Sequence, residues 1–154
     1  MSPHAVRDWF VADHLLLDTL LDEILIALDA QDAEELSALW PGFTRRLLHH
    51  MDVEERCLFP HVDERAIRGA RALHEEHRYI RTRSADLAEG VESAIARSDE
   101  IRAFADELRA HASHEDRMLY AWTDQHLRPD ERRNLLHQLE EAGRLLEVEC
   151  SSRR

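Results

Sequence analysis

Two glutamates interrupt the apolar stripes of predicted helices in this chain, and each follows a histidine by four residues. They form the pairs His50-x-x-x-Glu54 and His111-x-x-x-Glu115, in register with apolar residues repeated at helical spacing. Burial of an unpaired carboxylate is strongly unfavourable, so these side chains need a compensating positive charge. Because histidines lie beside them on the same stripes, the pattern predicts a metal site inside a bundle of helices.

Composition and periodicity favour an all-α fold. Only 4 glycines and 4 prolines occur in 154 residues, while alanine, leucine, glutamate and arginine are abundant. Caps and apolar periodicity predict helices over about 2–29, 32–59, 63–97, 98–122 and 129–149. We expect an antiparallel, up-down-up-down four-helix bundle over residues 1–127. The fifth helix, within residues 128–154, would pack on the bundle or on a partner subunit.

The second predicted helix carries two local signals. Asp32 and Glu35 form an Asp-x-x-Glu pattern typical of a helix start. Pro41 and Gly42 lie inside the same segment, and they should kink the helix or delay its regular start.

Two further histidines, His14 and His77, lie on the apolar stripes of the first and third predicted helices. In an alternating bundle, these two and the two His-x-x-x-Glu pairs fall at a similar height. That height is roughly 10–20 Å from one end, at 1.5 Å of rise per residue. The four helices are therefore predicted to share one site.

An internal repeat supports a two-fold arrangement of that site. Residues 50–63 align without gaps to 111–124, and the short sequence at 12–14 resembles that at 75–77. Each half of the chain thus supplies one lone histidine and one His-x-x-x-Glu pair. Four histidines and two glutamates are too many ligands for one structural zinc and too rich in nitrogen for calcium or magnesium. They suit two iron ions, or less readily two manganese ions, bridged by carboxylates.

These residues resemble the hemerythrin-like, or HHE cation-binding, domain family. The resemblance covers about residues 6–125, and it rests on matching segments around the predicted ligands. They are His14, HMDVEE with the following LFP at 50–60, Glu76-His77, and HASHE with the following LY at 111–120. The family implies a four-helix bundle that holds a non-heme di-iron centre, in which two carboxylates and an oxo or hydroxo group bridge the irons. It also implies a second histidine ligand on the third helix, for which His74 is the candidate.

The resemblance leaves Asp116 as an alternative to Glu115, although helix geometry and the repeat favour Glu115. The predicted metal ligands are therefore His14, His50, Glu54, His74, His77, His111 and Glu115. We interpret the remaining histidines at 4, 49, 61, 114, 126 and 137 as surface residues. Tyr79, Tyr120 and Trp122 are interpreted as core or packing residues.

Three functions fit such a centre. The first is binding of O2, for oxygen storage or sensing. The second is an oxidoreductase that removes peroxide or acts in nitric-oxide and oxidative stress. The third is an iron-responsive regulatory module. A redox partner and the choice between monomer and homodimer stay open.

Charge and hydropathy restrict the location and partners of the protein. The net charge of -12 argues against nucleic-acid binding. The sequence has no apolar run of membrane-spanning length and no signal peptide, so we expect a cytoplasmic protein that does not enter a membrane. Cys57 and Cys150 are far apart and indicate no disulfide framework.

Overall fold

The structure is a computed structural model that describes residues 6–65, 67–92 and 98–151. These residues form helices and contain no strand, which confirms the predicted all-α class. The elements are α1 (Val6–Asp29), α2 (Ala33–Cys57), α3 (Phe59–Glu64), α4 (Ala70–Glu92), α5 (Ser98–Glu115), η1 (Asp116–Tyr120), α6 (Ala121–His126) and α7 (Pro129–Ser151).

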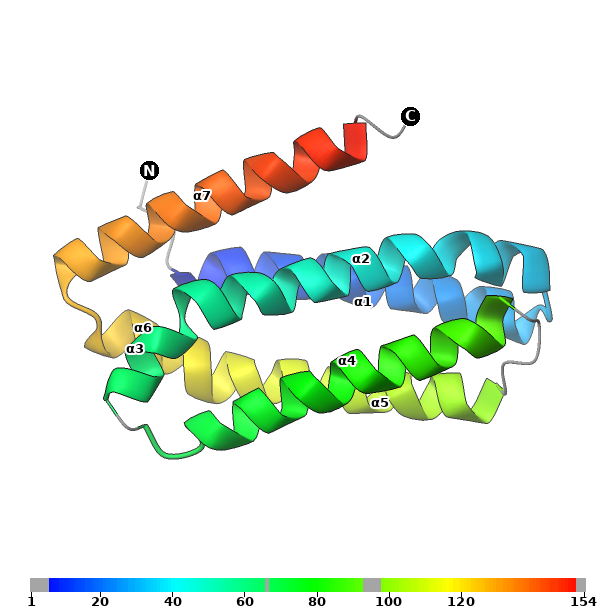
Figure 1. Ribbon diagram of the computed structural model, residues 1–154, viewed down its shortest axis with the longest axis horizontal. Coiled ribbons are helices and arrows are strands. Elements are labelled where there is room, and N and C mark those ends of the chain that lie inside the picture. The colour runs from blue at the N-terminus through cyan, green and yellow to red at the C-terminus, as the bar shows by residue number, and fades with distance from the viewer. Residues whose placement is uncertain (1–5, 66, 93–97, 152–154) are drawn as a thin grey trace.

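Four long helices, α1, α2, α4 and α5, form a helical bundle (Figure 1). Helix α1 lies against α2 and α5, and α4 lies against the same two helices. The core between them is built from the predicted apolar stripes. Its fully buried aromatic residues include Phe43 on α2 and Phe104 on α5.

Helix α2 begins as its sequence predicts. Asp32 is the N-cap residue, and its Oδ1 accepts a hydrogen bond of 3.0 Å from the backbone N–H of Glu35. The helix starts at Ala33 and continues through Pro41. Pro41 and Gly42 therefore do not delay its start. The residues of the predicted apolar stripe of α2 are all buried from Trp40 to Glu54. The helix face that packs in the core therefore continues into the site.

The third predicted helix begins later than its sequence suggests. We expected it to start near Asp63, but residues 59–64 form the separate short helix α3 and the long helix α4 starts at Ala70. Gly69 precedes α4 with a φ of 95°, a left-handed conformation that glycine adopts without strain. The chain can therefore fold back here and bury Phe59 at the end of the bundle. The predicted end of this helix, at 93–97, lies outside the described residues.

A π-helical turn, η1, interrupts the fourth helix directly after Glu115. The pattern of apolar residues predicted a continuous α-helix to about Trp122. Instead η1 shifts the register of the last positions, and α6 completes the segment. Such π-turns are rare and are frequently found at functional sites.

Helix α7 lies outside the four-helix bundle, along α1 and α2 (Figure 1). Its buried residues Leu135, Leu139 and Ala142 join a second apolar cluster with Val6 and Phe10 of α1. Within the described residues, none of the helices is both long enough and apolar enough to cross a membrane.

Replacement of Leu139 by alanine should lower the free energy of unfolding by about 2–5 kcal/mol, because the side chain is fully buried. Leu145 on the same helix is 63% exposed, so Leu145→Ala should change stability by less than about 0.5 kcal/mol. Urea unfolding of the two variants compares these values. Equal effects of the two substitutions would contradict the packing of α7 on the bundle.

Candidate metal centre

Six of the seven predicted ligands meet at one level of the bundle. They come from all four long helices: His14 from α1, His50 and Glu54 from α2, His77 from α4, and His111 and Glu115 from α5. Both glutamates are 0% exposed. The apolar stripes that bury the core therefore also bring these polar side chains together, as their register on each helix predicts.

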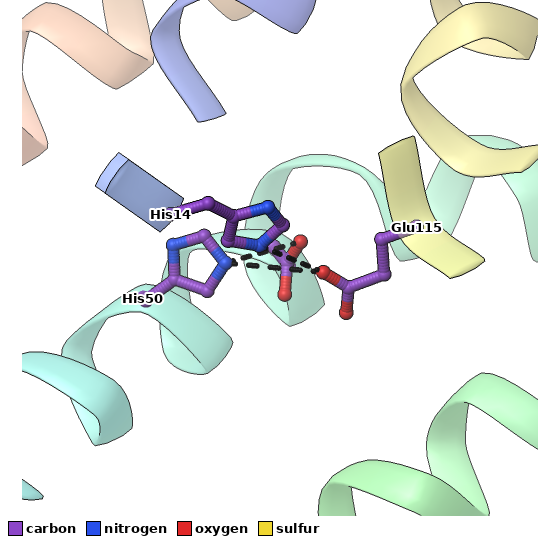
Figure 2. Close-up of side chains that lie close together, drawn as sticks. His14, His50 and Glu115 are labelled. Atoms are coloured by element: carbon purple, nitrogen blue, oxygen red, sulfur yellow. Dashed lines mark ion pairs between the residues drawn. The ribbon is translucent and has the colours of Figure 1, made fainter. Parts of the chain in front are cut away.

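The first group contains His14, His50, Glu54 and Glu115. His14 Nε2 lies 3.2 Å from Glu115 Oε2, and His50 Nε2 lies 3.9 Å from the same oxygen. His50 Nε2 is also 3.5 Å from Glu54 Oε1. Figure 2 shows both imidazole rings turned toward the Glu115 carboxylate. Two nitrogen and two oxygen atoms thus converge on one point.

The second group contains His77, His111 and the opposite oxygen of Glu115, and the second oxygen of Glu54 lies near His77. His77 Nε2 lies 3.1 Å from Glu115 Oε1 and 3.3 Å from Glu54 Oε2. His111 Nε2 lies 2.5 Å from Glu115 Oε1. Each glutamate therefore directs one oxygen to each group, which is the arrangement of a bridging carboxylate.

Two buried polar atoms in this cluster lack a hydrogen-bond partner within the described part of the chain. They are Glu54 Oε2 and His111 Nε2. Although each lies close to a charged neighbour, neither makes a hydrogen bond of acceptable geometry. Orphaned atoms of this kind are rare in buried positions. A cation bound by both groups would satisfy them, so the donor set fits the metal that the sequence predicts.

Each of the four histidines is also held from behind by a carboxylate. The Nδ1 atoms pair as His50 with Asp13 at 2.7 Å, His111 with Glu76 at 2.6 Å, His77 with Glu55 at 2.9 Å, and His14 with Asp116 at 3.2 Å. Such carboxylates fix the ring orientation and keep Nε2 directed at the metal position.

These outer carboxylates follow the internal repeat. Asp13 corresponds to Glu76, and Glu55 corresponds to Asp116. Asp13 and Glu76 each contact a histidine from their own half of the chain. Glu55 and Asp116 each contact a histidine from the other half. None of the four was predicted to orient a histidine, and only Asp116 was considered, as an alternative to the ligand Glu115. Their signal was available, because each is adjacent to a ligand in both copies of the repeat.

The family model for the Hemerythrin HHE cation binding domain matches residues 5–123. The chain belongs to the hemerythrin family. Searches of curated proteins and of solved structures gave no match. The matched residues include all six residues of the cluster, so the family assignment and the geometry concern the same part of the molecule.

His74, the additional ligand suggested by the hemerythrin resemblance, is not brought to the cluster. Its Nε2 lies 2.9 Å from Asp63 Oδ2, and its side chain is 42% exposed. A physical reason is the ring of Phe59, which packs against both His74 and His77 with centroids 4.5 and 4.9 Å apart, while His74 is turned toward Asp63. Asp116, the alternative to Glu115, contacts the outer nitrogen of His14 and does not enter the cluster.

Arginines support two of the outer carboxylates. Arg46 binds Asp13, with its Nε at 2.9 Å, and Arg81 Nη2 lies 2.9 Å from Glu55 Oε1. Burial raises the pKa of Asp13, but His50 and Arg46 outweigh it and hold the pKa below its usual value. This charge keeps Asp13 available as an acceptor for His50.

In the metal-free protein, protons stabilise the cluster. Burial lowers the pKa of His77, but the hydrogen bond with Glu115 and the nearby charge of Glu54 outweigh it and raise the pKa to about 10. The pKa values of His50 and His111 are also raised against the effect of burial, mainly by the neighbouring glutamate charges. The folded state therefore retains protons that the unfolded chain loses near pH 6.5.

The stability of the metal-free protein should consequently fall as the pH rises from 6.5 toward about 10. The stabilisation by these protons is complete below the pKa of the unfolded chain. Between the unfolded and the folded pKa, the contribution of each such histidine to the free energy of unfolding falls by about 1.4 kcal/mol per pH unit. Urea unfolding at about pH 7 and about pH 9 measures this slope, and His77→Gln should reduce it. A flat profile of the metal-free protein would contradict the assignment of these protons.

Tyr120 is the site residue that sequence analysis interpreted as packing. Its ring does pack, since it stacks on Phe10 with centroids 4.7 Å apart. Its hydroxyl, however, lies inside the first group, where it donates a hydrogen bond of 2.8 Å to Glu115 Oε2 and closely approaches Glu54. Burial and the two carboxylates raise the pKa of Tyr120 well above its ordinary value.

A cavity of about 50 Å³ lies beside the cluster, between α1, α2 and α5. His14, His50 and His111 form its polar side, and Leu17, Leu47 and Leu108 are among its apolar walls. Phe10 does not line this cavity, and its ring stacks on Tyr120. The space is small and largely apolar, so it suits a ligand of two or three heavy atoms.

Proposed function

We propose that this protein holds two iron ions and binds O2 at them, in oxygen binding, storage or sensing. His14 and His50 would hold one ion, and His77 and His111 the other. Glu54 and Glu115 would bridge them. The observation that carries the proposal is the division of both carboxylates between two pairs of histidine nitrogens. We also propose that the four long helices alternate in direction, in an up-down-up-down order.

When bound, a ferrous pair supplies electrons and open coordination positions for a small oxidant. The residues of the chain orient and protect that chemistry. The carboxylates behind the histidines keep each Nε2 directed inward, and Arg46 and Arg81 keep two of those carboxylates charged. The apolar walls of the cavity limit the access of water to the histidines.

The test is anaerobic reconstitution with ferrous iron followed by exposure to O2. The proposal predicts two irons per chain and absorption bands that form with O2 and disappear when it is removed. Bands that form once and do not reverse would reject oxygen carriage. They would favour the oxidoreductase alternative, which continuous consumption of added peroxide or nitric oxide would then establish.

Replacement of Leu108 by phenylalanine should fill part of the cavity and slow the binding of a small anion to the oxidised protein. We expect a decrease of about tenfold, which corresponds to about 1.4 kcal/mol. Stopped-flow mixing with azide measures the rate, and metal content should stay unchanged. Leu15→Phe is the matched control, because Leu15 is exposed on α1. Equal rates in the two variants would exclude this cavity as the ligand site.

A further inference from the structure

The hydroxyl of Tyr120 lies within 3.5 Å of four candidate ligand atoms. Its oxygen is 2.8 Å from Glu115 Oε2, 3.2 Å from His14 Nε2 and 3.5 Å from His50 Nε2. It also approaches Glu54 Oε1 closely. Two of these neighbours are carboxylate oxygens and two are the metal-directed nitrogens of the first group. A hydroxyl that served only as a packing or capping group would need one such partner.

Those separations match the edges of a coordination polyhedron. In an octahedron with bonds of about 2.1 Å, adjacent donor atoms lie about 3.0 Å apart. A cation that touches the other four atoms of the group would therefore lie within bonding distance of the phenol oxygen. The oxygen occupies the place of a fifth donor above the other four.

The π-turn explains why the hydroxyl reaches this place. Tyr120 follows Glu115 by five residues, and side chains at that spacing point about 140° apart in a regular α-helix of 3.6 residues per turn. The i-to-i+5 bonding of η1 brings the two side chains to the same side of the helix. The rare backbone geometry and the position of the hydroxyl therefore lead to the same site.

Among the residues that the structure describes, none places an equivalent hydroxyl in the second group. In the internal repeat, Phe59 corresponds to Tyr120, and its ring packs against His77 with centroids 4.9 Å apart. The repeat thus gives two similar sets of histidine and carboxylate donors but only one phenol. The two metal positions are chemically unequal.

We propose that Tyr120 is the fifth protein ligand of the iron ion held by His14 and His50, and that it binds ferric iron as a phenolate. The phenol proton leaves to solvent when the oxygen binds the ion. Tyrosine oxygen is an established ligand of iron in proteins. The ion held by His77 and His111 would keep more exchangeable positions, and His111 also lines the cavity beside the cluster. This inference rests on the proposed two-iron site.

The chain offers a matched control, because it has 2 tyrosines and the other, Tyr79, is exposed and bonded to Glu107. The full-length protein loaded with ferric iron should show a visible phenolate-to-iron absorption band. Excitation in that band should enhance tyrosine ring vibrations in the resonance Raman spectrum. Tyr120→Phe should abolish both signals, and Tyr79→Phe should retain both. Incorporation of ring-deuterated tyrosine into the unmutated protein should shift the enhanced vibrations.

The outcomes separate this inference from the proposed function. A protein that binds two ferric ions without the band or the ring vibrations would overturn the role of Tyr120 and leave the two-iron site intact. Persistence of the signals in a folded Tyr120→Phe variant would also overturn it. If that variant does not fold, the isotope shift in the unmutated protein decides. Failure to bind iron at all would instead reject the proposed function.

Discussion

Replacement of Glu115 by glutamine is expected to weaken the binding of both metal ions by more than about a hundredfold. Loss of a residue that only orients a ligand costs about 10–100-fold in metal affinity, and in the proposed centre Glu115 would bind both metal ions directly. Its two oxygens lie 3.2 Å from His14 Nε2 and 3.1 Å from His77 Nε2. Glutamine keeps the size of the side chain but cannot offer two anionic oxygens.

Metal titration under anaerobic conditions, followed by iron analysis after gel filtration, measures this loss. Asp106→Asn makes the same chemical change at an exposed position of α5 and should keep full metal content. His74→Ala should also keep it, because His74 is bound to Asp63 away from the cluster. Retention of two ions by the Glu115→Gln variant would contradict the bridging role.

Removal of the metal ions is expected to lower the melting temperature by about 15–30 °C. Each ion at a thousandfold excess over its Kd adds about 4 kcal/mol to folding stability, and 1 kcal/mol corresponds to about 2–4 °C for a chain of this size. The effect arises because the ions neutralise Glu54 and Glu115, which are fully buried.

Calorimetry of the iron-loaded protein before and after exhaustive chelation measures the difference. Restoration of the original melting temperature on reloading is the control for irreversible damage. A melting temperature that is unchanged by chelation would show that the buried carboxylates do not depend on metal. A large decrease in melting temperature on chelation is also what the iron-responsive regulatory module requires, because in that alternative metal binding is coupled to folding.

The all-α class and the grouping of the ligands could be predicted because they depend on helical periodicity. A histidine and a glutamate four residues apart must share a helix face, and an apolar stripe must face the core. The internal repeat added the two-fold relation between His50 and His111. These constraints are local in the sequence. The predicted grouping of the ligands therefore did not depend on where each helix begins or ends.

Features set by tertiary packing were not predicted. The start of α4 depended on the positive φ of Gly69 and the burial of Phe59, which periodicity does not report. The π-turn at 116–120 changes the face on which Tyr120 lies, and its sequence reads as an ordinary helix. His74 was suggested as a ligand by resemblance, but its side chain packs on Phe59 and pairs with Asp63.

X-ray diffraction data collected on either side of the iron absorption edge would test the central claim most directly. We expect two anomalous peaks between Glu54 and Glu115, about 3.5–4 Å apart, each next to two histidine nitrogens. A single peak, or iron bound at a different position in the chain, would contradict the two-ion centre.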